Sequence, residues 1–224
     1  MDLQYTYSFP KRKKNIFERF SLTTNLVILN VFLFVVFYFL IYSGVLSMDY
    51  IALNPSNIVN NISIWTFLTS MFMHASFFHL IVNMISLFFI GTLIEKLLGK
   101  KRYLLFYLFA GLFSGLLFIA SSFIFTSDFN AYAVGASGAI FGLIGVLMFL
   151  TPNLPVYMMF IPIPIKMKYA APGMLILLWI ISMGLSIPIG NAAHLGGFLF
   201  GIFYGLYLKH KYPNKVRQIS RQFR

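Results

Sequence analysis

The sequence predicts an all-α membrane protein, a bundle of six transmembrane helices whose first outer loop is partly embedded in the bilayer. Three observations lead to this fold class. Hydrophobic residues make up 59% of the chain and charged residues only 10%, whereas soluble domains carry about 25% charged residues. The apolar residues gather in six long runs, which is the pattern of a multi-pass protein. Every lysine and arginine also falls in or at the edge of a segment that would lie on one side of the membrane.

The six apolar runs are the predicted spans, because a helix needs about 20 residues to cross the hydrocarbon. The first run is longer than the apolar core of a signal peptide, about 7–15 residues, so we expect a retained span and no cleavable signal peptide. In order along the chain, the runs cover residues 22–45, 75–97, 103–126, 137–151, 169–187 and 192–208.

The fourth run is too short for a full span. Its 15 residues rise about 22 Å at about 1.5 Å per residue, against about 30 Å of hydrocarbon. The preceding segment "SDFNAYAVGA" must therefore descend into the membrane to meet it. Irregular backbone at that depth requires protein or water around it, so we expect Ser137 in a water-filled cavity below the outer surface.

The loop between the first two runs contains "NPSNIVNNISIWTFLTSMFMH". Its polar start and apolar end predict the partly embedded first outer loop.

The positions of the 17 lysines and arginines predict the orientation. These residues favour the cytoplasmic side of a membrane. Six crossings with both termini in the cytoplasm leave none of them in the outer loops 46–74, 127–136 and 188–191. We therefore expect an integral, multi-pass protein with cytoplasmic termini, in the plasma membrane of a prokaryote.

The net charge of +12 could indicate nucleic acid or anionic lipid as a partner. The basic residues flank membrane spans, where lipid head groups attract them by about 1 kcal/mol each, so we expect the lipid bilayer as a partner and no nucleic acid. The chain divides into a basic N-terminal segment 1–21, a membrane domain 22–208 and a basic tail 209–224. The absence of cysteine excludes disulfides and thiol catalysis.

His79 and Asn83 are the first informative polar pair inside the predicted spans. Four residues apart, they share one helical face. Taken alone, this pair is better explained by hydrogen bonding between helices than by a role in chemistry. His74 is five residues from His79, so the two cannot ligate one metal from a regular helix, and we expect no metal site and no cofactor.

Ser137 begins the fourth run in "GASGAIFG". A serine there could simply cap the helix. Helix N-termini also present unpaired N–H groups and a positive dipole end, which would stabilise an oxyanion forming beside a reactive serine.

His194 begins the sixth run, near the same outer level as Ser137. Glycines on the two helices permit close backbone contact, which would bring an imidazole to the serine hydroxyl, the minimum for base-activated nucleophilic attack. The acids offer no obvious third member, so a Ser-His dyad is favoured over a triad, with Asp128 as the alternative third residue. The glycines are Gly138, Gly142 and Gly145 on one helix and Gly197, Gly201 and Gly205 on the other.

Three motifs together resemble the rhomboid family of intramembrane serine proteases. "HASFFHLIVN" is similar to the family's His-x4-His-x3-Asn, "GASG" to its Gly-x-Ser-Gly, and "AHLGGFLFG" to its Ala-His-x-x-Gly-x-x-x-Gly. They fall in the family's order on the second, fourth and sixth runs. The resemblance covers the chain from about Trp65 to Gly205.

The resemblance implies roles for individual residues. Ser137 would be the nucleophile and His194 the general base and then the general acid. His79 and Asn83 would donate to the oxyanion beside the Ser137 N–H. Structural support would come from His74, Glu95, Gly135, Gly138, Phe141, Gly197 and Gly201, with Glu95 bracing the cytoplasmic end of the bundle.

Two positions depart from the family pattern. Trp65 is followed by Thr66 where members often have arginine, which puts the stability of the first loop in question. Phe141 stands where some members have tyrosine; it can still stack on His194 but has no hydroxyl.

We therefore expect a serine endopeptidase that cleaves single-span or other membrane-anchored proteins near the outer end of a transmembrane segment. The alternative is a non-catalytic rhomboid-like protein that binds membrane helices, which would be expected to lack the serine or the histidine.

Overall fold

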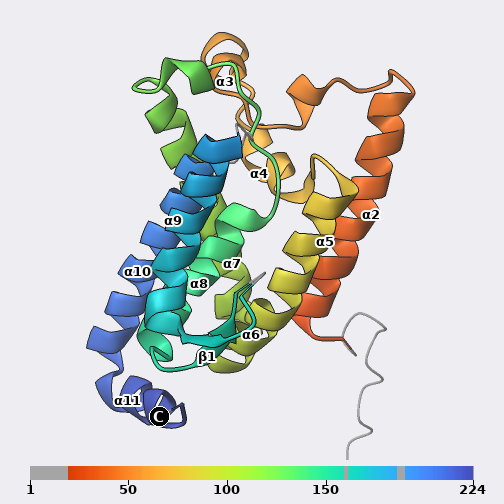
Figure 1. The fold of residues 1–224 in the computed structure, drawn as a ribbon. Helices are drawn as coiled ribbons and strands as arrows, with labels where there is room; N and C mark the ends of the chain where they lie inside the picture. The colour runs from red at the N-terminus through yellow and green to blue at the C-terminus, as the bar shows by residue number, and fades with distance from the viewer. Residues whose placement is uncertain (1–19, 159–160, 186–189, 224) are drawn as a thin grey trace, which may run out of the picture.

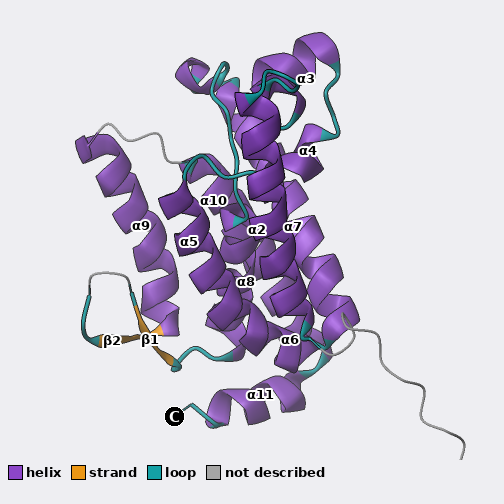
Figure 2. Cartoon of the chain, turned by 90° about the vertical axis from the view of Figure 1, so that its right-hand side faces the viewer, coloured by secondary structure: helices purple, strands orange, loops and turns teal. Residues whose placement is uncertain are grey.

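The structure, a computed structural model, describes residues 20–158, 161–185 and 190–223 (Figure 1). The predicted basic segment 1–21 lies outside the described residues up to residue 19. The long helices of the described residues form a bundle, with loops and short helices at one end and a small hairpin and a final helix at the other (Figure 2). These helices are α2 (Leu22–Tyr42), α5 with α6 (Phe77–Ser86 and Thr92–Leu98), α7 (Lys100–Ser122), α8 (Ser137–Leu150), α9 (Met167–Leu185) and α10 (Asn191–Lys211).

Four helical rods of the described chain are long and apolar enough to cross a membrane, namely α2, Phe77–Leu98, α7 and α9. The π-helical turn η3 (Leu87–Gly91) joins α5 to α6. α8 is shorter, with 14 residues, as the sequence predicted. A mostly helical membrane fold is thus confirmed, while six crossings and the partial embedding of the first outer loop stay predictions.

α8 lies at the centre of the bundle. It packs against α10 and α7, and its residues from Gly138 to Leu147 are all buried. A helix that is apolar on every face is stable only when it is enclosed. α2 and α9 are also apolar but face outwards, since each buries only three residues. The outer helices therefore present the lipid-facing surface, and α8 forms the core.

Glycines allow α8 and α10 to touch through their backbones. A Cβ atom on Gly197 would overlap the carbonyl oxygen of Gly138, and one on Gly201 would overlap that of Gly142. On Gly145 it would lie 2.6 Å from the carbonyl oxygen of Phe198. This spacing brings the first turn of α10 against the first turn of α8.

The first outer loop is folded into short helices: η1 (Met48–Tyr50), α3 (Pro55–Asn61), α4 (Thr66–Thr69) and η2 (Ser70–Phe72). The indole N–H of Trp65 donates to the carbonyl oxygen of Tyr50 at 3.0 Å. Thr66, which stands at the position of the missing arginine, is fully buried and donates to Ser63 O at 2.6 Å. The hydroxyl of Thr69 donates to Ile51 O at 2.7 Å. These three neutral hydrogen bonds help to hold the loop.

Further short elements were not expected from the sequence. An antiparallel hairpin pairs β1 (Pro155–Tyr157) with β2 (Pro164–Lys166) between α8 and α9. The segment assigned as a basic tail is largely helical, because α10 runs on to Lys211 and α11 (Pro213–Arg221) follows. The 3₁₀ turn η4 (Thr126–Asp128) follows α7. Each is too short for its periodicity to stand out from the neighbouring apolar runs.

Candidate active site

Ser137 is the first residue of α8 and is reached through an unusual backbone turn. Gly135 has φ +113°, a conformation that favours glycine. Its N–H donates to Ser70 O at 2.8 Å, and Ala133 exchanges two backbone hydrogen bonds with Leu53. The first outer loop therefore holds the segment that leads into Ser137. The side chain of Ser137 is partly exposed, so it remains accessible.

His194 lies beside this serine. Its Nε2 atom is 2.8 Å from Ser137 Oγ, although 57 residues separate the two in sequence. The Phe141 ring stacks on the imidazole with centroids 4.6 Å apart and planes 28° apart. The imidazole is 8% exposed. The hydroxyl of Ser137 is thus bonded to His194 and does not cap α8, and the stack fixes the plane of the histidine.

No third residue completes a triad in the described part of the chain. His194 Nδ1 is buried and has no hydrogen-bond partner there. Asp128, the alternative third member, is in η4, where its carboxylate accepts from Ser127 at 3.4 Å. This alternative is therefore wrong, because the loop that carries Asp128 turns its carboxylate towards its own neighbour.

His79 lies on the other side of Gly135. A Cβ atom on Gly135 would be 2.8 Å from His79 Cε1 and 3.8 Å from Ser137 Oγ, so glycine leaves the space that brings the imidazole near the serine. Ser76 caps α5 by accepting from the His79 N–H at 3.1 Å. His74 and His79 contact edge to face with centroids 5.3 Å apart. His79 is therefore held from the first outer loop.

Asn83 lies one turn further along α5 and is buried. Its amide donates to His79 O at 2.8 Å, and its Oδ1 atom has no partner in the described residues. Asn83 makes no hydrogen bond to Ser137 in the described residues, whereas a Cβ atom on Gly135 would lie close to both His79 and Ser137. The hydrogen bond from Asn83 to His79 lies within α5. A purely structural role of Asn83 predicted a hydrogen bond to another helix instead.

Glu95 is remote from the serine and joins two helices. Its carboxylate accepts from Leu22 N at 2.9 Å, Thr23 N at 2.8 Å and Thr23 Oγ1 at 2.7 Å. These backbone N–H groups belong to the first turn of α2, which has no intrahelical acceptor for them. Glu95 therefore fastens the start of α2 to α6.

Sequence reasoning missed Ser114. Its hydroxyl donates to Ala193 O at 2.7 Å, next to His194, and a Cβ atom on Gly138 would overlap it. Ser114 therefore ties α7 to the first turn of α10 beneath the serine and histidine. The signal that could have found it is the run of small residues Gly111, Ser114 and Gly115 on one side of α7.

Together, these residues have the arrangement that nucleophilic catalysis requires. A hydroxyl lies at the positive end of the α8 dipole, with an imidazole nitrogen in hydrogen-bond contact and another imidazole across Gly135. Unpaired N–H groups of the first helical turn are available to a developing oxyanion. A model of the Rhomboid domain matches residues 61–211, which include all of them. The chain belongs to the rhomboid family.

Relatives of this rhomboid occur in plants and bacteria. It is 37% identical to RHOMBOID-like protein 1 of Arabidopsis thaliana over 161 residues, which cover 69% of this chain and 37% of that protein. It is 32% identical to Rhomboid protease GluP of Bacillus subtilis over 143 residues, 62% of this chain and 25% of that protein. Putative rhomboid protease YdcA of the same species is 42% identical over 86 residues, 38% of this chain and 41% of that protein. The chain thus spans less than half the length of these relatives.

The family and the long apolar helices together make this rhomboid an integral, multi-pass membrane protein. The resemblance drawn from the three sequence motifs is thereby confirmed, and some relatives carry the name protease.

Proposed function

We propose that this rhomboid is an intramembrane serine endopeptidase that uses a Ser137–His194 dyad. The observation that carries the proposal is the 2.8 Å contact between Ser137 Oγ and His194 Nε2. Two different helices supply these atoms, and glycine contacts between the helices hold them together. A structural serine or histidine would not require this pairing, whereas a base-activated nucleophile does.

The proposed reaction follows from the positions of these groups. As Ser137 Oγ attacks the substrate carbonyl carbon, His194 Nε2 takes its proton. The resulting oxyanion is stabilised by the Ser137 N–H at the start of α8 and by His79, with Asn83 reorienting its amide to contribute. Collapse breaks the C–N bond, and the leaving amine takes the proton from His194. Water then hydrolyses the acyl ester with His194 again acting as the base.

The substrate is proposed to be a single-span or otherwise membrane-anchored protein. The described lysines and arginines belong to the elements at the α6 and α11 end of the bundle, and the loop that leads into α8 comes from the opposite end. With that basic end in the cytoplasm, the termini are cytoplasmic and Ser137 faces outwards. The scissile bond then lies near the outer end of the client segment. The plasma membrane of a prokaryote is the proposed location.

A small residue before the scissile bond is the expected specificity. Gly135 and Gly138 flank the serine, and a peptide bond must leave its helix to be attacked. Segments with glycine or proline unwind more readily, since these residues cost about 1 and 3 kcal/mol in a helix. Cleavage after Ala, Gly or Ser is therefore expected, without ATP.

The test is labelling by a fluorophosphonate probe in detergent, followed by cleavage of a single-span model substrate with mass spectrometry of the products. Wild type should be labelled and active. Ser137→Ala and His194→Ala should lose cleavage while remaining folded, and Ser121→Ala, whose hydroxyl donates to Phe118 O, should match wild type. Absence of both labelling and cleavage in the wild type would favour the non-catalytic alternative.

A further inference from the structure

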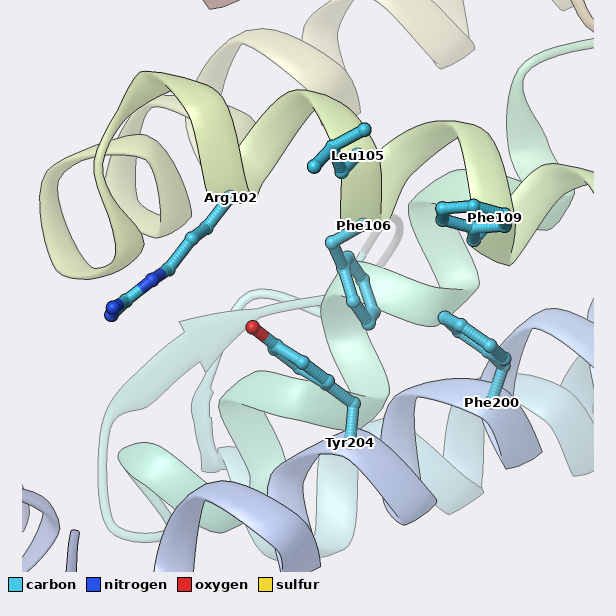
Figure 3. Close-up of a pocket in the computed structure, with 6 residues that line it drawn as sticks. All are labelled: Arg102, Leu105, Phe106, Phe109, Phe200 and Tyr204. Carbon is cyan, nitrogen blue, oxygen red and sulfur yellow. The ribbon is translucent and has the colours of Figure 1, made fainter. Parts of the chain in front are cut away.

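A groove separate from the serine lies between α7 and α10. It encloses about 220 Å³ and is lined by four residues of α7 and two of α10 (Figure 3). Leu105 is 46% exposed and Phe109 55% exposed, so the groove opens on the outer surface of the bundle. The lining residues are Arg102, Leu105, Phe106, Phe109, Phe200 and Tyr204.

The walls of this α7–α10 groove are aromatic and closely packed. The Phe106 ring contacts Tyr204 with centroids 4.9 Å apart and Phe200 with centroids 5.4 Å apart. Both contacts are tilted. These rings line the groove and form an apolar trough. Because it faces the lipid side of a membrane protein, this trough can hold an extended acyl chain without exposing a polar group to hydrocarbon.

Positive charge gathers at one end of the α7–α10 groove. Figure 3 shows the guanidinium of Arg102 beyond the hydroxyl end of Tyr204. Arg102 Cζ is 6.0 Å from the centre of the Tyr212 ring, and the ammonium groups of Lys211 and Lys215 are 5.7 and 5.9 Å from the same point. Three cations on different turns thus surround one ring.

No carboxylate neutralises these cations in the described part of the chain. Glu95 is the acid described at this end, and its oxygens accept from Leu22 and Thr23. Asp49 and Asp128 belong to loops at the opposite end. The cluster therefore lacks an anion, and Arg102 offers the planar fork that matches phosphate.

Arg102 also lines a second cavity of about 120 Å³ with Tyr212 and Lys215. It thus stands between the α7–α10 groove and the junction of α10 with α11. A ligand bound here needs an anionic group at Arg102 and an apolar chain that extends along α7 towards Phe109. A membrane phospholipid has this order, with the phosphate at the surface and the acyl chain in the hydrocarbon.

We propose that the α7–α10 groove binds an anionic phospholipid, with its phosphate at Arg102, Lys211 and Lys215 and one acyl chain against Phe106, Phe109 and Phe200. A transmembrane segment of a second copy would fill the trough but bring no free carboxylate to these cations, since Glu95, the acid described at this end, is bonded to α2. The groove also adjoins the core, since a Cβ atom on Gly142 of α8 would contact Phe106 at 3.6 Å. Lipid binding therefore stabilises the α7–α10 pair.

The test uses the full-length protein, purified in detergent and stripped of lipid. Dioleoyl phosphatidylglycerol, dioleoyl phosphatidylcholine and glycerol 1-phosphate are added separately, and native mass spectrometry and the Tm report binding. Phosphatidylglycerol should bind and raise the Tm more than phosphatidylcholine, while glycerol 1-phosphate, which has no acyl chain, should do neither. Equal effects of the two lipids, or an equal effect of glycerol 1-phosphate, would overturn the proposal.

Variants separate the phosphate contact from the acyl contact. Arg102→Gln should weaken phosphatidylglycerol binding roughly tenfold and remove the preference over phosphatidylcholine, and Arg102→Lys should restore it in part. Leu105→Trp, which fills the groove, should reduce binding of both lipids. Lys101→Gln is the control, since Lys101 is exposed and lines neither cavity. If Arg102→Gln matches this control, or if Leu105→Trp abolishes a dimer instead of lipid binding, the proposal is wrong.

Discussion

Gly197 of α10 lies in direct contact with the carbonyl oxygen of Gly138 of α8, leaving no room for a side chain at position 197. Gly138 follows Ser137, and Gly197 is three residues beyond His194. This backbone contact therefore sets the distance between the serine hydroxyl and the imidazole. A packing feature of two membrane helices thus fixes the geometry of the candidate active site.

Gly197→Ala is expected to lower both activity and stability. The added methyl forces α8 and α10 apart, and overpacking of this kind costs about 1–3 kcal/mol. A shift of about 1 Å between reacting groups can cost roughly 10²-fold in rate. Gly173→Ala in α9 is the control, because a Cβ atom added at Gly173 would have no atom within 4 Å outside its own stretch of helix. Measurements of kcat and Tm that find the two variants alike would contradict this account.

Phe141→Leu is expected to lower kcat, whereas Phe141→Tyr should retain it. The stacked pair at 4.6 Å holds the plane of His194, and aromatic pairs of this kind contribute about 0.5–1.5 kcal/mol beyond burial. Leucine removes the stack, and tyrosine keeps it. The substrate-cleavage assay in detergent measures both, with the Tm as a check on folding. Full activity of Phe141→Leu would show that the stack does not position the histidine.

Asp49 joins the first outer loop to the segment before Ser137. Its Oδ1 atom accepts from the Tyr132 hydroxyl at 2.5 Å and from Asn57 Nδ2 at 2.7 Å. The Tyr132 hydrogen bond, followed by that of Asn57, lowers the pKa of Asp49 below its ordinary value of 3.8. A carboxylate with a lowered folded-state pKa contributes stability above its unfolded pKa, and that contribution is lost as the pH falls through the folded pKa.

Asp49→Asn should therefore lower the Tm at pH 7 and have a smaller effect on the Tm at a pH well below 3.8. Thermal unfolding of wild type and variant at both pH values measures the difference. Tyr132→Phe should show the same trend, because it removes the first of the two donors. Asp128→Asn is the control, since Asp128 contacts the neighbouring Ser127. A Tm difference between wild type and Asp49→Asn that does not shrink in acid would refute the linkage.

The sequence predicted the helical core and the residues of the candidate site because both depend on local patterns. The runs of apolar residues match the helices to within a few residues, and the short fourth run is short in the structure. Ser137 and His194 could be paired in advance because glycines recur every three or four residues on both helices. Each of these signals is carried within one segment of the chain.

Contacts between segments far apart in the sequence could not be predicted in the same way. The bonds from Tyr132 to Asp49 and from Ser114 to Ala193 join residues 83 and 79 positions apart. The sequence contains many other hydroxyl groups that could donate to the Asp49 carboxylate or to the Ala193 carbonyl oxygen. Likewise, the π-helical turn packs against α2 and α8 and the hairpin packs against α9, and periodicity within a segment does not encode such contacts.

Glu95→Gln is expected to lower the free energy of unfolding with little effect on kcat. Hydrogen bonds to a charged acceptor contribute about 1.5–3 kcal/mol, and the amide has one acceptor oxygen where the carboxylate has two. The first turn of α2 would lose an acceptor, while Ser137 lies far along the bundle. Limited proteolysis within α2 and the Tm measure the effect, with Lys96→Gln as the control. A variant with unchanged Tm but lost activity would show that Glu95 acts on the active site.

The last prediction separates His79 from Asn83. The His79 ring lies across Gly135 from Ser137, whereas the Asn83 amide donates to the His79 carbonyl. If both side chains stabilise the oxyanion, each alanine variant should be slower than wild type by at most about 10²–10³-fold, which is the contribution of one donor. The loss should be smaller than in the Ser137 and His194 variants, because the Ser137 N–H remains.

His79→Gln should recover part of the rate through its side-chain N–H. Asn83→Asp, which replaces the amide donor with an acceptor, should be as impaired as Asn83→Ala. Steady-state kinetics with the single-span substrate decide the matter. If both alanine variants retain the wild-type kcat, the two residues serve packing alone.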